Sequence, residues 1–133
     1  SAEEGRQLFS VYCSNCHQIN NMGGDIGPQL DGIGNWGHRA LTEKILDPNR
    51  NVSRVFVNYD ISLANGNIAS GMLRREEGET IVFANVAGQE FSLTKKEILE
   101  MNVSPYTLMP DNFGEMISDE EYYALLSYLL SEN

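Results

Sequence analysis

Cys13-Ser14-Asn15-Cys16-His17 is the stretch that decides how this chain folds. It contains both cysteines of the 133-residue protein and one of its two histidines. Two cysteines three positions apart, followed at once by a histidine, form the spacing that attaches a haem covalently. Each thiol bonds one haem vinyl group, and the histidine is held below the ring, where it supplies an axial nitrogen to the iron. The motif therefore predicts one covalent c-type haem, attached at Cys13 and Cys16, with His17 as the proximal iron ligand.

Other interpretations of the motif have weaker support. A redox-active Cys-x-x-Cys pair needs a neighbouring βαβ pattern, and the sequence shows none. A structural zinc site needs four ligands, and His38 is the one further histidine available. A chance match in a loop is the third alternative.

Length and composition bound the class of protein. A chain of 133 residues with 41% hydrophobic residues suits one globular domain. No apolar run approaches the roughly 20 residues of a membrane helix, so we expect no membrane span. The formal net charge of −10 argues against nucleic acid and anionic membranes as partners.

The start of the chain, Ser1-Ala2-Glu3-Glu4, is polar and acidic and does not read as a signal peptide. Thioether attachment of haem takes place outside the cytoplasm. We therefore expect a periplasmic or otherwise extracytoplasmic protein whose export signal has been removed or lies upstream. The chain is then either a mature protein or a domain of a larger one.

Acidic residues gather toward the end of the chain. Residues 99–133 contain no lysine or arginine, and their seven acids are Glu100, Asp111, Glu115, Asp119, Glu120, Glu121 and Glu132. One interpretation is a solvated acidic surface. The other is a docking face for a redox partner whose own docking face is basic.

Helices are predicted at both ends of the chain and once between them. Apolar residues at 3–4 spacing indicate a helix over residues 2–12, and a shorter one is expected over 41–46. Ser118 and Glu121 form a capping box that begins the last helix. Gly5 is a poor helix residue, so we expect close contact there with the last helix, with Phe9 packed against Leu125 and Tyr128.

The middle of the chain reads as β structure. From Val57 the residues alternate as in a half-buried strand, and Asn65-Gly66 is a strong hairpin signal. Four short strands are expected within residues 55–93. The predicted fold class is therefore α+β: one domain over 1–133, with a helical haem core of 1–54 and 99–133 interrupted by a small antiparallel β insertion at 55–98. We expect the insertion to be structural or partner-binding and to supply no iron ligand.

Several motifs together resemble the class I cytochrome c family. The match rests on Gly5-x3-Phe9-x3-Cys13, the haem motif, Gly27-Pro28, and Met109-Pro110 ahead of an aromatic-rich last helix. Three further segments and the strand-rich middle are similar to planctomycete-type haem-binding domains, cytochrome c modules with a long β insertion. Those segments are Asp25-Ile26-Gly27-Pro28-Gln29-Leu30, Ile45-Leu46-Asp47-Pro48-Asn49-Arg50 and Ser104-Pro105-Tyr106-Thr107-Leu108-Met109-Pro110.

The resemblance implies further haem-binding residues. The carbonyl of Pro28 would accept a hydrogen bond from His17, although Gly27-Pro28 also reads as an ordinary turn. Met109 matches the distal ligand position, and it lies in mid-loop before Pro110. The other methionines are Met22, Met72, Met101 and Met116. Ligation by His38 and an open or water-bound iron are the alternatives.

Haem propionates would need donors of their own. Trp36 is either a core residue or, as in related cytochromes, an indole donor to a propionate. Arg39, Arg50 and Arg54 are candidates for the same anions, because a guanidinium pairs with carboxylate through two parallel hydrogen bonds.

The function expected from these features is one-electron transfer without enzymatic activity, in a soluble carrier or a module of a larger exported protein. Iron ligated on both sides by His and Met has no position for a substrate, so the chemistry reduces to electron exchange. The alternatives are a haem enzyme or gas sensor with an open sixth position, such as a small peroxidase, and a partner-recognition module that uses the haem as a redox relay.

Overall fold

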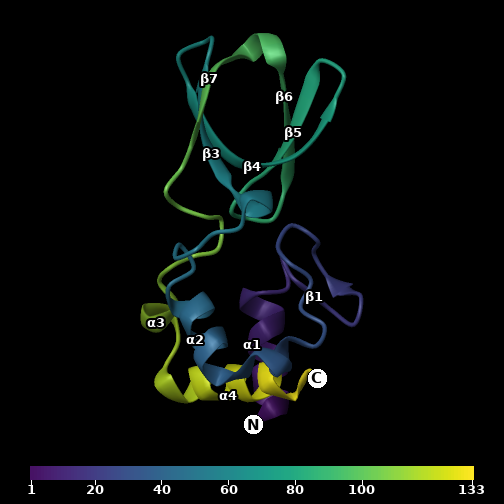
Figure 1. Cartoon of the computed structure of the whole chain (residues 1–133), viewed down its shortest axis with the longest axis vertical. Coiled ribbons are helices and arrows are strands. Elements are labelled where there is room, and N and C mark those ends of the chain that lie inside the picture. Colours follow the sequence, from purple (N-terminus) through teal and green to yellow (C-terminus); the bar gives the residue numbers. More distant parts are fainter. The chain divides into compact units, whose positions relative to one another are not determined.

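The computed structural model describes all 133 residues and divides them into two compact units (Figure 1). The helical unit consists of Ser1–Pro48 and Asp111–Asn133, and the β unit consists of Asn49–Pro110. Helices and strands are both well represented, so the expectation of a mixed α+β chain is confirmed.

The helical unit contains four helices, a 3₁₀ turn and a two-stranded hairpin. Its elements are α1 (Ala2–Tyr12), β1 (Gln18–Ile19), β2 (Met22–Gly23), η1 (Ile33–Trp36), α2 (Gly37–Leu46), α3 (Phe113–Met116) and α4 (Asp119–Ser131). The helix expected over 41–46 begins four residues earlier, at Gly37, and no side chain caps its N-terminus. No helix combines the length and the apolar character needed to cross a membrane.

Contact between α1 and α4 forms the centre of the helical unit, as predicted from Gly5. A Cβ atom added to Gly5 would lie 2.7 Å from Cβ of Tyr128 and would overlap the backbone carbonyl of Ala124. Only glycine lets the two helices approach this closely. The ring of Phe9 lies 5.7 Å from the ring of Tyr128 at an interplanar angle of 56°, and Leu125 is buried on the same helix.

The predicted capping box of α4 is confirmed. The Ser118 N–H donates to Oε1 of Glu121 at 2.9 Å, and the Glu121 N–H donates to Oγ of Ser118 at 3.1 Å. Two backbone donors that the helix itself cannot satisfy are thereby paired. The first turn also holds Asp119 and Glu120, whose charges complement the positive end of the helix dipole.

The β unit is one five-stranded antiparallel sheet in the order β6-β5-β4-β3-β7. Its elements are η2 (Arg54–Phe56), β3 (Asn58–Leu63), β4 (Ile68–Glu77), β5 (Thr80–Ala84), β6 (Glu90–Thr94), η3 (Lys95–Glu97) and β7 (Ile98–Val103). The expected four strands are therefore one too few. The missed strand, β7, pairs with β3, and all of it after Ile98 lies in residues 99–133, which were expected to belong to the helical haem core.

The two edge strands of this sheet are joined by only three residues, Lys95–Glu97. In a flat sheet, four spacings of roughly 4.8 Å would separate the edges by about 19 Å. Four Cα–Cα steps of at most ~3.6 Å reach only about 14 Å. The sheet must therefore curl, as Figure 1 shows.

Curling gives the β unit an interior of its own. Ile61 and Phe83 are fully buried there, and the Phe83 ring is stacked on Phe91 with centroids 5.4 Å apart. A Cβ on Gly71 would lie 2.9 Å from both Phe83 and Phe91, so glycine is required beside the stacked pair.

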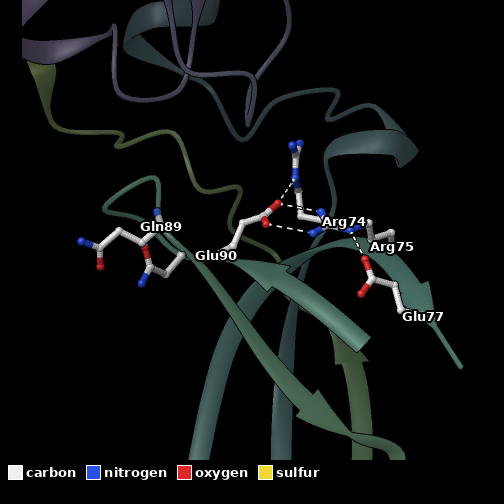
Figure 2. Close-up of polar contacts among 6 residues, drawn as sticks. Arg74, Arg75, Glu77, Gln89 and Glu90 are labelled. Atoms are coloured by element: carbon white, nitrogen blue, oxygen red, sulfur yellow. Dashed lines mark hydrogen bonds and ion pairs between the residues drawn. The ribbon is translucent and has the colours of Figure 1, made fainter. Parts of the chain in front are cut away.

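An ion-pair network links β4 to the start of β6 (Figure 2). The register of β4 shifts between Leu73 and Arg75, and both Arg74 and Arg75 reach Glu90. Arg75 donates from Nη1 and Nη2 to the two Glu90 carboxylate oxygens at 2.9 and 3.2 Å, and from Nε to Glu77 at 2.7 Å. These hydrogen bonds raise the pKa of Arg75 and lower the pKa of Glu90.

Candidate functional site

The Cys13–His17 segment forms a helical turn directly after α1. The N–H of Cys13 continues the helix by donating to the Phe9 carbonyl at 2.9 Å. The N–H groups of Cys16 and His17 both donate to the Cys13 carbonyl, at 3.2 and 3.0 Å. Side chains three and four residues apart lie on the same side of such a turn. The two thiols and the imidazole therefore share one side, as attachment and ligation of a single haem require.

The His17 imidazole is fixed by a hydrogen bond. Nδ1 lies 2.7 Å from the Pro28 carbonyl oxygen, and since a carbonyl only accepts, Nδ1 carries the proton. The lone pair is then on Nε2, the nitrogen available to a metal. The predicted pairing of His17 with Pro28 is thus present in the structure.

Gly27 lies against the face of the same ring. A Cβ there would be 2.8 Å from Cε1 and 3.0 Å from Nδ1 of His17, so a larger residue would displace the imidazole. The Gly27 N–H donates to the Cys16 carbonyl at 2.7 Å and holds this loop against the cysteine turn. The donor set and its support fit a covalent haem with an axial histidine.

Two further glycines support the turn and were not singled out from the sequence. A Cβ on Gly24 would lie 2.8 Å from the Asn15 carbonyl carbon, and the Gly24 N–H donates to the Ser14 carbonyl at 2.7 Å. Gly23 has a φ of 118°, which side chains with a Cβ rarely adopt. Consecutive glycines shortly after the motif are the signal that indicates such a close approach.

Burial sets the protonation states in this loop. It raises the pKa of the Cys13 thiol to about 12, with a smaller contribution from Cys16, and it also raises the pKa of Cys16. Reactive dithiol pairs have lowered pKa values, so these thiols lack the character of a redox pair. Burial also lowers the pKa of His17, although the Pro28 carbonyl opposes this, and so favours the neutral imidazole that binds metals.

Free metal-ion sites do not account for the motif. Its three side chains form no metal-binding cluster, either with one another or with other His, Cys, Asp or Glu side chains. This arrangement suits thioether attachment, in which the sulfur atoms bond carbon and only the histidine ligates iron.

The remaining predicted residues of the helical unit lie on the segment that follows the proline loop. Trp36 ends η1 and is 58% exposed, so its interpretation as a core residue is wrong. Arg39 and His38 are exposed in the first turns of α2. Neither Trp36 nor Arg39 forms a hydrogen bond with the Cys13–His17 turn. The structure thus brings together the two cysteines, the histidine and the proline.

The five methionines differ in their surroundings. Met72 is buried in β4, and Met101 packs against the Ile61 and Phe83 core of the β unit. Met22 and Met116 of the helical unit are 75% and 43% exposed. Met109 is half-buried in the loop that follows β7, at the end of the β unit.

Comparison with known protein families agrees with this geometry. The family model described as Cytochrome c matches residues 2–83, which is more than half of the chain and includes the whole haem-attachment loop. No curated protein matches the chain. The family's c-type haem is covalently bound and transfers electrons, and Cys13, Cys16 and His17 fit its attachment site. The chain therefore belongs to the cytochrome c family, class I, and carries one covalent c-type haem.

Proposed function

We propose that this cytochrome is a non-enzymatic one-electron carrier or electron-transfer module whose haem iron is ligated by His17 and Met109. The haem supplies one-electron exchange at its iron. The chain holds it through two thioethers and keeps the proximal imidazole neutral and oriented. The observation that carries the proposal is the 2.7 Å hydrogen bond between His17 Nδ1 and the Pro28 carbonyl, which leaves Nε2 for iron.

The assignment of Met109 rests on its loop and on the state of the other methionines. Met72 and Met101 are engaged in the β unit and are poor candidates. Pro110 restricts the backbone of Met109 to extended conformations, which limits the positions that its sulfur can occupy. The match to the family model ends at residue 83 and does not include Met109.

Trp36 and Arg39 are proposed as donors to the haem propionates. Both are exposed on η1 and α2 of the helical unit, and Arg39 has no carboxylate partner within the chain. A guanidinium and an indole N–H suit propionate oxygens.

A basic docking partner is supported by the charges of the helical unit. Six of the seven acids in residues 99–133 belong to this unit. Asp119 and Glu120 are exposed at the start of α4 and pair with no lysine or arginine. Unpaired surface charges of one sign attract a partner of the other sign over distances of about 8–10 Å at moderate salt.

We also propose an extracytoplasmic, periplasmic location, since thioether attachment takes place outside the cytoplasm. The β segment at residues 55–98 is proposed as an insertion into the cytochrome core. This is supported by the compact units, because the helical unit is formed by segments on both sides of the β unit.

Substitution of Met109 tests the iron ligation. Met109→Ala in the holoprotein should abolish the sulfur-to-iron charge-transfer absorption of the ferric form, let the ferrous form bind carbon monoxide and lower the potential. Met116→Ala, which removes an exposed methionine, is the matched control and should change none of the three.

Two outcomes would contradict the proposal. A Met109→Ala protein that keeps the charge-transfer band would show that another group binds iron. Rapid binding of carbon monoxide by the unaltered ferrous protein would instead favour a sensor or peroxidase-like enzyme with an open sixth position.

A further inference from the structure

The loop that contains Met109 has no helix or strand, yet three backbone N–H groups anchor it. The Ser104 N–H donates to the Asn58 carbonyl at 2.9 Å, and the Tyr106 N–H donates to Oγ of Ser104 at 3.1 Å. The Thr107 N–H donates to Oδ1 of Asn49 at 2.7 Å. The last of these anchors is the closest in sequence to Met109.

Asn49 is well suited to this anchoring role. It is the first residue of the β unit, and 58 positions separate it from Thr107. Its side chain is half-buried and so is the hydrogen bond, which strengthens the bond relative to one in water. Removal of the acceptor would leave a partly buried N–H without a partner.

We propose that Asn49 is a positioning residue for the distal ligand. Met109 lies two residues after Thr107 and directly before Pro110, which restricts the backbone conformation of Met109. The short segment of residues 107–110 is therefore constrained at both ends. A thioether is a weak ligand whose bond to iron depends on the placement of its sulfur. Asn49 stabilises this placement through its hydrogen bond to the Thr107 backbone. This inference rests on the proposed ligation by Met109.

The variants separate the hydrogen bond from other effects of Asn49. Asn49→Ala removes the acceptor, whereas Asn49→Asp keeps an oxygen in the same place. The matched control is Asn85→Ala, because Oδ1 of Asn85 accepts from the N–H groups of Ala87 and Gln89 in a turn of the same unit, each at 3.0 Å.

Imidazole binding to the ferric holoprotein is the main measurement, because imidazole competes with the methionine sulfur. We expect Asn49→Ala to bind imidazole about tenfold more tightly and to weaken the charge-transfer absorption, as expected from the loss of one buried hydrogen bond. Asn49→Asp should restore affinity to within about twofold of the unaltered protein. Asn85→Ala should match the unaltered protein.

Amide hydrogen exchange of Thr107 gives an independent readout, and it should accelerate in Asn49→Ala alone. If Thr107 exchanges faster while imidazole affinity equals that of Asn85→Ala, the positioning role is wrong even when Met109→Ala confirms ligation. If Met109→Ala keeps the charge-transfer band, the proposed ligation itself fails. Should Asn49→Ala not yield holoprotein, Asn49→Ser, whose hydroxyl is too short to reach Thr107, is judged by the same criteria.

Discussion

The two compact units of this cytochrome differ most in charge. The helical unit has twelve acidic and three basic residues, whereas the β unit has seven and six. Nearly all of the net charge therefore belongs to the part that carries the haem-attachment motif. In the β unit, acids and bases are paired in networks such as Arg75 with Glu77 and Glu90. The excess of acidic residues is therefore concentrated in the unit that carries the haem-attachment motif.

The units also differ in how they achieve close packing. The helical unit depends on glycines that allow backbone contact, at Gly5 between helices and at Gly27 against His17. The β unit depends on a curled sheet around aromatic rings. Substitutions in the core of one unit should therefore leave the packing of the other unit largely unchanged.

The largest expected effect is in the β unit. Phe83→Ala removes a fully buried ring stacked on Phe91 and should lower the free energy of unfolding of this unit by about 3–5 kcal/mol. Denaturant unfolding followed by amide exchange in β3–β5 measures it. Covalent haem, checked by mass spectrometry, should be retained. Val86→Ala, at a 73% exposed position, is the control. Loss of haem in Phe83→Ala would show that the units are not independent.

The matching change in the helical unit is Gly5→Val. Its side chain would overlap the Ala124 carbonyl and should separate α1 from α4, at a cost of about 3 kcal/mol. Gln7→Val is the control: it places valine at an exposed position of α1, where the substitution affects helix propensity but not the contact with α4. Amide exchange should accelerate in α4 and stay unchanged in the β unit. Equal stability of the two variants would mean that the close contact contributes little.

A smaller, kinetic effect tests the charge difference. Reduced protein should transfer an electron to the cation hexaammineruthenium(III), giving ferric protein and ruthenium(II), more slowly as ionic strength rises from about 0.01 to 0.15 M, because the Debye length falls from roughly 30 to 8 Å. Replacing Asp119, Glu120 and Glu121 by the corresponding amides should lower the rate at low ionic strength several-fold and so weaken its dependence on salt, because steering scales with local charge. Neutralising Glu76, Glu79 and Glu100 of the β unit removes the same charge and should have less effect. Equal effects would assign the steering to net charge alone.

The smallest expected effect concerns Glu90, whose pKa is lowered in the folded state by Arg75 and Arg74. Because the folded pKa is depressed, the carboxylate stabilises the β unit fully above its ordinary pKa of 4.5 and loses this contribution as the pH falls through the lowered value. Glu90→Gln should therefore be less stable than the unaltered protein at pH 7, with a difference that shrinks below about pH 4.5. A difference independent of pH would exclude the ion pairs as its cause.

Local signals in the sequence predicted the elements that depend on local chemistry. The capping box predicted the start of α4, and the presence of glycine at position 5 of a helix predicted the contact between α1 and α4. In contrast, β7 was missed because Ile98 and Met101, which both face the β core, are three residues apart. A shift in register between Ser62 and Leu63 breaks the period of two that identifies strands. The start of α2 was missed because Gly37 and His38 are weak helix formers and no side chain caps them.

In the candidate site, too, the local features were predicted and the long-range contacts were not. The haem motif and the Gly27-Pro28 turn lie within 16 residues, and their relation was predicted from spacing and resemblance. The hydrogen bond from Thr107 to Asn49 joins residues 58 positions apart, and no sequence pattern predicts such a pair. Such a contact forms only because the strands between Asn49 and Thr107 fold so that the two residues come close together.

The number of strands in the curled sheet determines the relative direction of its two edge strands. In an antiparallel sheet, neighbouring strands alternate in direction, so five strands leave the two edges, β6 and β7, with the same sense. A parallel pair needs a crossover of a dozen or more residues, and the three residues Lys95–Glu97 cannot provide it. The two edge strands, β6 and β7, therefore do not pair with each other, and each keeps one unpaired side. A sixth strand placed between β6 and β7 would run antiparallel to both.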